Sequence, residues 1–244
     1  MVQRVALVTG GSRGIGAAIV KALAARGFKV AVNCLNNTSM AEQVLRESGG
    51  DGGVFPADAR DHAQVAAMVK AVEASLGPVD AAIHNANIHF PMGLFWLQPW
   101  PDVQAKLLGE LGAFHALVAA TAPGMIERKW GRVVAVSSSL SRFASEGFGA
   151  HAAAKSAVDG AVRVLSREMG PSGVTVNVVA PGLVETDATA QQPQDMKQAI
   201  ARFTPLKRLA VPEDIGGAVA FLCTDDARWI TGQYIPLNGG INTV

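Results

Sequence analysis

Short apolar segments alternate with longer amphipathic segments along the 244-residue chain. The apolar segments have the length and the β-branched content of strands: Arg4 to Val8, Lys29 to Asn33, Gly53 to Pro56, Val79 to His84, Arg132 to Ser137, Val174 to Val179 and Gln233 to Leu237. Between them, apolar side chains return every three or four residues, which predicts helices that begin near Gly14, Ser39, His62, Pro101, Gly149 and Pro212. Because strand and helix alternate strictly and the strands are apolar throughout, the pattern predicts an α/β fold, a Rossmann-type doubly wound parallel sheet of about seven strands with helices on both faces.

The segment from Leu183 to Leu206 fits neither pattern, since it follows a strand directly and is rich in Thr, Gln and Pro. Long irregular segments at the carboxyl edge of such a sheet usually form lids or substrate loops, so a loop of this kind is expected here. Apolar residues make up 49% of the chain, which is enough for one large core. Residues 1–244 are therefore expected to form a single domain.

The charge and the cysteine content narrow the expected partners and compartment. Twenty-one basic and twenty acidic residues give a formal net charge of +1, which offers no basic surface for nucleic acid or a membrane, so small-molecule or protein partners are expected. The uncharged segment from Ala81 to Pro101 is interrupted by histidines, asparagines and prolines, so no membrane span is predicted. Cys34 and Cys223 are too few for a disulfide scaffold, and no secretory signal is recognised, so a cytoplasmic protein is expected.

A glycine-rich sequence, Thr9-Gly10-Gly11-Ser12-Arg13-Gly14-Ile15-Gly16, lies between the first strand and the first helix. Gly10 permits a tight turn, Gly14 lets the backbone approach a pyrophosphate, and Gly16 lets the helix pack closely. The unpaired N–H groups and the positive dipole at the helix N-terminus favour a bound anion. In this strand-to-helix context the glycines predict a dinucleotide site.

Together with later motifs, this loop resembles the short-chain dehydrogenase/reductase family over essentially the whole chain, and in particular its 3-oxoacyl-carrier-protein reductase type. The later motifs are Ala57-Asp58-Ala59, His84-Asn85-Ala86-Asn87, Asn177 to Ala180, Pro181 to Thr186, Ile230 to Gln233 and Asn238 to Gly240. The resemblance implies a nicotinamide dinucleotide site made by Gly10, Ser12, Arg13, Gly14, Ile15, Gly16, Asn33, Asp58, Ala59, Asn85, Ala86, Lys155, Pro181, Gly182, Val184 and Thr186. The family's Asn-Asn-Ala-Gly is altered at both ends here, and Asn87 places a side chain where the backbone ordinarily passes close to the cofactor.

The absence of an acidic residue at the end of the second strand favours NADP over NAD. A carboxylate at the end of that strand would bond the ribose hydroxyls of NAD and repel a 2′-phosphate, but no Asp or Glu occurs from Gly16 to Ala41. Arg13 in the glycine loop can reach such a phosphate as a charged donor. The expected cofactor is therefore NADP, used as NADPH.

The resemblance also implies a catalytic group of serine, tyrosine, lysine and asparagine, and this chain differs at two of those positions. Ser138 at the end of the fifth strand matches the serine, and Lys155 matches the lysine. His151 stands in place of the tyrosine, one helical turn before Lys155, and counting back from Gly131 places Glu110 at the asparagine. His151 is interpreted either as a donor, directly or through water, or as a packing residue in a site that no longer catalyses. Glu110 either pairs with Lys155, orients His151, or lies on the helix surface.

These motifs predict an NADPH-dependent reductase of a keto group in a small-molecule or carrier-protein-bound substrate, such as a 3-oxoacyl or polyketide-type thioester. Two alternatives stay open: a catalytically inactive cofactor-binding subunit that pairs with an active paralogue, and non-redox chemistry with His151 as a base. The resemblance implies a homotetramer formed through the helices near Pro101 to Arg128 and Gly149 to Gly170, or a hetero-oligomer for an inactive subunit. The histidines at positions 84, 89, 115 and 151 lie on separate elements, so no metal site is predicted.

Overall fold

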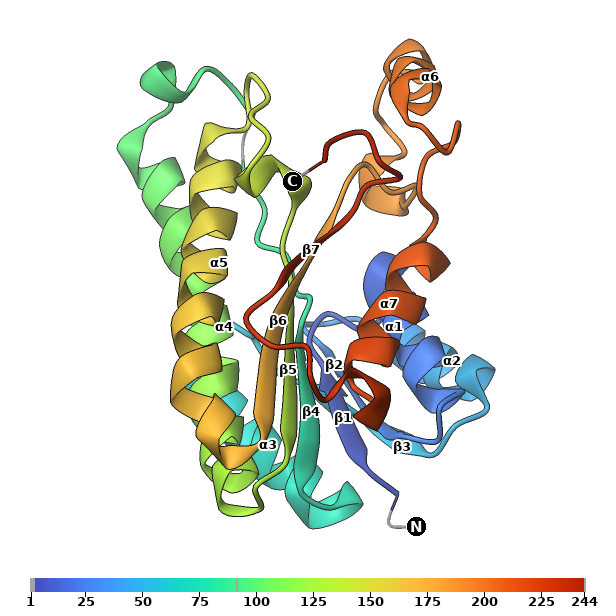
Figure 1. The fold of residues 1–244 in the computed structure, drawn as a ribbon, viewed down its shortest axis with the longest axis vertical. Helices are drawn as coiled ribbons and strands as arrows, with labels where there is room; N and C mark the ends of the chain where they lie inside the picture. The colour runs from blue at the N-terminus through green and yellow to red at the C-terminus, as the bar shows by residue number, and fades with distance from the viewer. Residues whose placement is uncertain (1–2, 91, 244) are drawn as a thin grey trace.

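A parallel sheet of seven strands is covered by helices on both faces in the computed structural model, which describes residues 3–90 and 92–243 (Figure 1). The strands are β1 (Val5–Val8), β2 (Lys29–Cys34), β3 (Gly52–Pro56), β4 (Val79–His84), β5 (Gly131–Val136), β6 (Val174–Pro181) and β7 (Tyr234–Leu237). The helices are α1 (Gly14–Ala24), α2 (Thr38–Ser48), α3 (His62–Leu76), α4 (Trp100–Glu127), α5 (Gly149–Met169), α6 (Gln194–Phe203) and α7 (Pro212–Leu222). The predicted doubly wound α/β fold is confirmed.

The expectation of an irregular segment from Leu183 to Leu206 is wrong in part, because this segment contains α6 and a short 3-10 turn at Asp187–Thr189. The apolar stripe of α6 has only three members, Met196, Ile200 and Phe203. The helical spacing of these residues is present in the sequence, but it is short and follows a segment rich in Thr, Gln and Pro, so the pattern did not predict a helix.

In the strand order β3-β2-β1-β4-β5-β6-β7, strands β2 and β3 are added on one side of β1 and strands β4 to β7 on the other. The direction in which strands are added therefore reverses between β1 and β4. Val8 of β1 pairs with Ile83 of β4, and the next residue, His84, pairs with Ala135 of β5. The carboxyl ends of these three strands therefore lie together at one edge of the sheet. In open α/β sheets a ligand binds in the crevice at this point.

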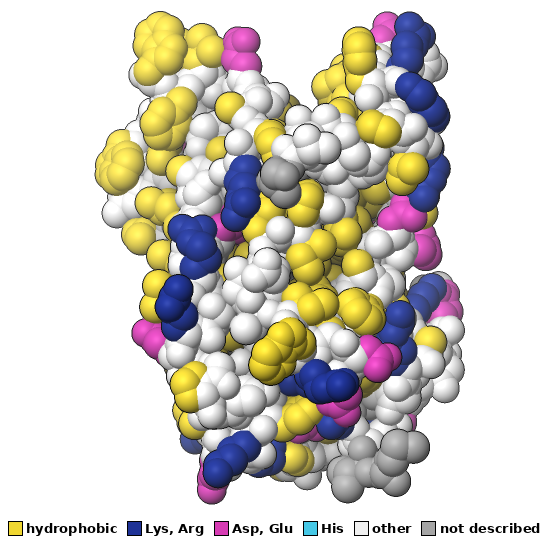
Figure 2. Space-filling model, viewed as in Figure 1, with side chains coloured by type: hydrophobic (Ala, Val, Ile, Leu, Met, Phe, Trp, Pro, Cys, Tyr) yellow, Lys and Arg dark blue, Asp and Glu magenta, His cyan; other side chains and the backbone are white. Residues whose placement is uncertain are grey.

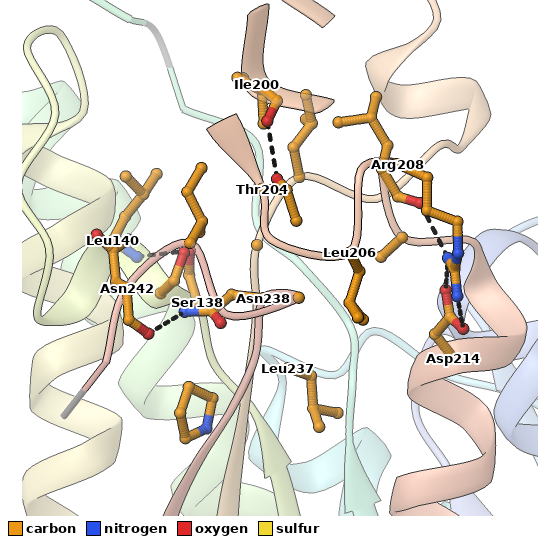
Figure 3. Close-up of a pocket in the computed structure, with 18 of the residues that line it drawn as sticks. Ser138, Leu140, Ile200, Thr204, Leu206, Arg208, Asp214, Leu237, Asn238 and Asn242 are labelled. Carbon is orange, nitrogen blue, oxygen red and sulfur yellow. Dashed lines mark hydrogen bonds and ion pairs between the residues drawn. The ribbon is translucent and has the colours of Figure 1, made fainter. Parts of the chain in front are cut away.

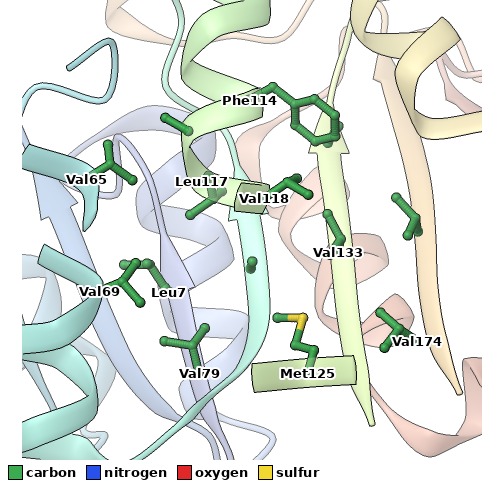
Figure 4. Packing of buried hydrophobic residues seen from close by; sticks show 14 of the residues in the cluster. Leu7, Val65, Val69, Val79, Phe114, Leu117, Val118, Met125, Val133 and Val174 are labelled. Atoms are coloured by element: carbon green, nitrogen blue, oxygen red, sulfur yellow. The ribbon is translucent and has the colours of Figure 1, made fainter. Parts of the chain in front are cut away.

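Two apolar layers, one on each face, hold the sheet between its helices. One layer packs β-strand residues against α3, α4 and α5, with Phe114 and Leu117 of α4 buried within it (Figure 4). The other packs the opposite face against α1, α2 and α7 through residues such as Ile19 and Ile215. Burial within this core accounts for Phe114, Leu117 and Val118 of α4 without a second copy of the chain. Among the described helices, none is both long and apolar enough to cross a bilayer.

Local signals in the sequence set the ends of the helices. The carboxylate of Asp61 caps α3 by accepting hydrogen bonds from the N–H groups of Ala63 and Gln64, at 2.9 and 3.1 Å. Gly49 ends α2 in the left-handed conformation, with φ of 61°. Asp61 thus fixes where the chain turns after the carboxyl end of β3, and Gly49 fixes where it enters β3 at the opposite edge of the sheet.

We predict that Leu117→Ala lowers the free energy of unfolding by about 3 kcal/mol, because it empties a fully buried position between α4 and the sheet. Urea unfolding followed by circular dichroism measures the loss. Leu108→Ala on the same helix is the control, since Leu108 is 58% exposed. Equal losses in the two variants contradict the packing described here.

Candidate active site

The glycine loop between β1 and α1 has the backbone shape that its sequence predicts. Gly10 and Gly14 have positive φ angles of 63° and 52°. A Cβ on Gly16 would lie 2.1 Å from the carbonyl oxygen of Gly10, so only glycine fits there. Arg13 precedes α1 in extended conformation and makes no side-chain cap to the helix. The first N–H groups of α1 are thus left for an anionic ligand.

A cleft of about 730 Å³ runs from the glycine loop across the carboxyl ends of the central strands. Its lining includes every residue predicted to meet the cofactor: Gly10, Ser12, Arg13, Gly14, Ile15, Gly16, Asn33, Asp58, Ala59, Asn85, Ala86, Lys155, Pro181, Gly182, Val184 and Thr186. These residues come from distant parts of the chain and meet here because their strands are parallel. The cleft therefore has the position and the donors that suit a dinucleotide.

Several predicted cofactor residues use their side chains inside the protein and present other atoms to the cleft. The Asn33 amide nitrogen donates to the carbonyl oxygens of Phe55 and Ala57, each at 3.1 Å. The Asn85 amide donates to the carbonyl oxygens of Thr9 and Gly10, each at 3.0 Å. These two asparagines shape the cleft by fixing the backbone around it.

Asp58 is also engaged, through an ion pair with Arg60. The Asp58 and Arg60 side chains approach to 2.6 Å, and hydrogen bonds from Arg60 hold the pKa of the Asp58 carboxyl below its ordinary value. Asp58 therefore carries its charge at neutral pH, at the adenosine end that the family resemblance assigns to it.

The side chain of Asn87 is held by a lysine behind the cleft. Its Oδ1 accepts a hydrogen bond from Lys106 Nζ at 2.9 Å, and the carbonyl oxygen of Ile88 accepts another at 2.8 Å. Asn87 still lines the cleft, but its amide oxygen is directed to the protein. Asn87, which stands where the family has glycine, is thereby linked by a hydrogen bond to a second residue, Lys106.

Ser138 lies at the junction between the cleft and a second cavity. Ser137 lines the cleft and Ser139 lines the second cavity, whereas Ser138 lines both. Its Oγ accepts a hydrogen bond from the N–H of Leu140 at 3.2 Å, and its carbonyl oxygen accepts one from the hydroxyl of Tyr234 at 3.3 Å. Among these three adjacent serines, Ser138 is therefore the one that faces both spaces.

His151 lies in the first turn of α5 and is 8% exposed. Its ring stacks on Phe90 with the centroids 4.6 Å apart, and its Nδ1 has no hydrogen-bond partner among the described residues. Burial, assisted by the nearby Lys106 and Lys155 cations, lowers the pKa of His151 to about 3. The imidazole is therefore neutral at physiological pH, and it lines the cleft as a weak acid.

Glu110 lies behind the cleft and contacts two lysines and a histidine. Its Oε1 is 2.5 Å from Lys155 Nζ and 3.3 Å from His84 Nε2, and its Oε2 is 2.6 Å from Lys106 Nζ. Lys155 Nζ also donates to the carbonyl oxygen of Val136 at 2.9 Å. Of the three interpretations of Glu110, this geometry matches the pairing with Lys155, and among the described residues Glu110 makes no hydrogen bond or ion pair with His151.

The ionisation of this cluster follows from its burial and its opposite charges. Burial alone raises the pKa of Glu110, but Lys155, His84 and Lys106 together hold it well below its ordinary range. Burial lowers the pKa of Lys106 to about 8, with Glu110 acting in the opposite direction. Burial also lowers the pKa of His84, which is completely enclosed. At neutral pH the cluster therefore holds a carboxylate, two ammonium groups and a neutral imidazole.

A second cavity of about 500 Å³ opens from Ser138 toward α6. Its walls are largely apolar, with Leu140, Ile200, Leu206 and Leu237 directed into it (Figure 3). In the space-filling view, the surface has a notch between the start of α4 and α6, where the protein is open to solvent (Figure 2). The cavity has the size and character of a site for an apolar organic group.

The sequence reasoning identified neither Lys106 nor the contact between Phe90 and His151. Lys106 lies four residues before Glu110 on one helix, a spacing that brings side chains together, and this was the available signal. No comparable signal links Phe90 to His151. Among the described residues, no group of three or more His, Cys, Asp or Glu side chains is arranged to hold a metal ion.

Comparison with known proteins places the chain among reductases of this architecture. A family model described as Enoyl-(Acyl carrier protein) reductase matches residues 10–242. Nodulation protein G of Azospirillum brasilense is 38% identical over 245 residues, which cover 99% of each chain. The 3-oxoacyl-(acyl-carrier-protein) reductase FabG of Escherichia coli (strain K12) is 34% identical over 243 residues, covering 99% of this chain and 98% of that protein. FabG of Staphylococcus aureus (strain Mu50 / ATCC 700699) is 36% identical over 241 residues, covering 97% of each.

The chain belongs to the short-chain dehydrogenase/reductase family. Its similarity to FabG proteins extends over nearly their full length. The resemblance drawn from the sequence motifs is confirmed.

We predict that His151 makes the protein less stable in acid. The pKa of His151 is about 3 in the folded protein and 6.5 in the unfolded chain, so the unfolded chain binds one more proton between these values. The stability is fully present above pH 6.5 and falls below it, by about 2 kcal/mol at pH 5 for this residue. Urea unfolding at pH 7.5 and pH 5 measures the loss, which is smaller by this amount in His151→Gln.

His89→Gln is the matched control, because His89 is an exposed residue of the same cleft. This variant is expected to keep the pH dependence of the unmodified protein. Identical pH dependence in His151→Gln and the unmodified protein contradicts a neutral, buried imidazole at position 151.

Proposed function

We propose that the protein is an NADPH-dependent reductase of a keto group, acting on a small-molecule or carrier-protein-bound 3-oxoacyl or polyketide-type thioester. The observation that carries this proposal is the position of Ser138 at the junction of the cleft and the apolar cavity, with His151 and Lys155 in the same cleft. A reductase of this kind needs a cofactor and a carbonyl compound to meet at one point, beside groups that stabilise negative charge on oxygen.

The cleft fits a dinucleotide on structural grounds. Gly16 leaves no room for a side chain against Gly10, the start of α1 is uncapped by Arg13, and the cleft continues past Lys155 to Thr186. Lys155 has three N–H groups, of which one donates to Glu110 and one to Val136. The third is available among the described residues for a ribose hydroxyl.

The chemistry of the site follows from the charge that develops on the substrate oxygen. The nicotinamide supplies a hydride when it is bound. The Ser138 hydroxyl donates a hydrogen bond to the carbonyl oxygen, and the Lys155 ammonium provides a positive potential that stabilises the alkoxide. A neutral imidazole at position 151 is a hydrogen-bond donor and a weak acid, so the proton comes from solvent through a water molecule that His151 holds.

The apolar cavity supports an acyl or polyketide-like substrate. Leu140, Ile200 and Leu206 surround a space that suits a hydrocarbon group, and Ser138 marks the end at which the keto group would lie. The FabG relatives are named as reductases of 3-oxoacyl groups on a carrier protein, which agrees with this assignment. As in the family resemblance, α4 and α5 are proposed to form the contacts of a homotetramer.

A second candidate function is an inactive cofactor-binding subunit that associates with an active paralogue. The stacking of Phe90 on His151 and the low pKa of the imidazole favour it, because a covered neutral histidine is a poor proton donor. The same cofactor cleft serves both functions, so turnover by the isolated protein distinguishes them.

We predict that the purified protein oxidises NADPH in the presence of β-keto thioesters or diketones, and that kcat falls about 100-fold in His151→Ala. Loss of the side chain removes the donor that positions water at the alkoxide. In His151→Tyr the activity is expected to be kept or raised, because a phenol donates directly. Absorbance at 340 nm follows the reaction.

The two variants also decide between the candidates. Activity that arises only in His151→Tyr supports the inactive subunit and overturns the reductase. Activity that is unchanged in His151→Ala removes His151 from the mechanism.

We further predict that Arg13→Ala raises KM for NADPH about tenfold and leaves KM for NADH nearly unchanged, because a charge-assisted contact to the 2′-phosphate is lost. Arg13 lines the cleft next to the carboxylate-free end of β2. Arg163→Ala is the control, since Arg163 is exposed on α5 outside the cleft. An equal change for both cofactors in Arg13→Ala contradicts the assignment of NADP specificity.

A further inference from the structure

The buried charges around Glu110 do not cancel. The ammonium groups of Lys106 and Lys155 both contact its single carboxylate, and these three side chains are at most 4% exposed. His84, which also contacts Glu110, is neutral because burial lowers its pKa. The cluster therefore carries a net charge of +1 directly behind the cleft.

A carboxylate at position 110 would by itself neutralise the positive charge of Lys155 behind the cleft. Glu110 and Lys155 alone form a neutral ion pair, which projects only a weak potential into the cleft. The asparagine that the family resemblance places at position 110 is neutral and would leave the charge of Lys155 uncompensated. Lys106 adds one positive charge, so the net charge of the three side chains is +1. This is the same net charge that Lys155 would give beside a neutral asparagine.

We propose that Lys106 is a positioning residue that offsets the charge of Glu110, so that Lys155 keeps its positive potential toward an alkoxide formed in the cleft. Lys106 does not line the cleft and acts through Glu110 and Lys155. The kinetic part of this inference rests on the proposed reductase function. The electrostatic part concerns the protein without cofactor and does not depend on turnover.

The surroundings of Lys106 allow its charge to act at this distance. Its Nζ lies 5.1 Å from the centroid of the Phe90 ring, and the other neighbour of that ring is the imidazole of His151, at 4.6 Å between centroids. Lys106 is also completely buried. Aromatic and aliphatic groups screen a charge far less than water does, so removal of Lys106 is felt at His151.

The other charged and titratable groups around this turn of α5 are few. His84 approaches from β4, Glu110 from α4, and Asp159 from α5 itself. Asp159 is buried and its pKa is raised, chiefly by burial, with the Arg142 and Lys155 cations acting in the opposite direction. Of these groups, a change at Lys106 affects Glu110, which loses one partner, and His84, whose pKa Lys106 helps to lower.

Lys106 also holds the backbone after β4 through Asn87 and Ile88, and this structural role must be separated from its charge. The variant Lys106→Met loses both the charge and these contacts. The double variant Lys106→Met/Glu110→Asn loses the same contacts but restores the net charge of +1 through Lys155. A comparison of the two variants therefore isolates the charge.

The experiment measures two properties in the unmodified protein, in both variants and in Lys70→Met, an exposed lysine on α3 that serves as the control. The first is the pKa of His151, from the pH dependence of its Cε1 chemical shift in NMR of the cofactor-free protein. The second is kcat and KM for NADPH with a β-keto thioester. Thermal unfolding is recorded for each variant, so that kinetic and NMR data are compared between folded proteins.

In Lys106→Met we expect the pKa of His151 to rise by about one pH unit and kcat to fall about tenfold, with KM for NADPH changed less than threefold. In the double variant the pKa of His151 returns to within about half a pH unit, and kcat to within about threefold, of the unmodified protein, because a net charge of +1 is present again. Lys70→Met changes neither.

Two results overturn the inference: a His151 pKa that does not move in Lys106→Met, or a double variant that is no better than the single one. The second result assigns Lys106 to holding Asn87 and Ile88 only. If the unmodified protein shows no turnover, the reductase function fails, whereas the NMR titration still decides whether Lys106 offsets Glu110. If Lys106→Met does not fold but Lys106→Met/Glu110→Asn folds, the result supports the same charge pairing.

Discussion

The carboxylate of Glu110 lies where β4, α4 and α5 meet, and its charge links all three. Lys155 reaches it from α5, Lys106 from one turn earlier on α4, and His84 from the end of β4. Removing such groups from water costs several kcal/mol for each ion, and the cost is recovered only when every partner is in place. The position of Lys155 in the cleft and the course of the chain after β4 both depend on this buried cluster.

The fold and the cofactor cleft could be predicted from the sequence because their determinants are local or topological. The strands are apolar in continuous runs, and Gly16 is dictated by a close approach within its own loop. Once parallel pairing is inferred, residues as distant as Asn85 and Thr186 must reach one edge of the sheet. Helix α6 was missed because its apolar stripe of Met196, Ile200 and Phe203 is short and borders a polar segment.

The arrangement of the catalytic end depends on side-chain directions that no local pattern specifies. Position 110 was found by counting, yet the choice between Lys155 and His151 as its partner is made by the packing of α4 against α5. Likewise, Phe90 lies on a segment without regular structure, and only the folded chain brings it onto His151. The helical spacing of Lys106 and Glu110 was visible in the sequence, but it is equally typical of an exposed pair, and burial gives it its meaning.

The contact of Lys106 with Glu110 also constrains how this site can change during evolution. An asparagine at 110 beside an existing Lys106 leaves two enclosed cations without an anion, whereas a glutamate beside Lys155 alone is a balanced pair. A glutamate at position 110 is therefore tolerated without a lysine at position 106, whereas a buried lysine at position 106 needs the glutamate. Descendants that lose one of the two are expected to lose the other, so the pair should be inherited or discarded together across related sequences.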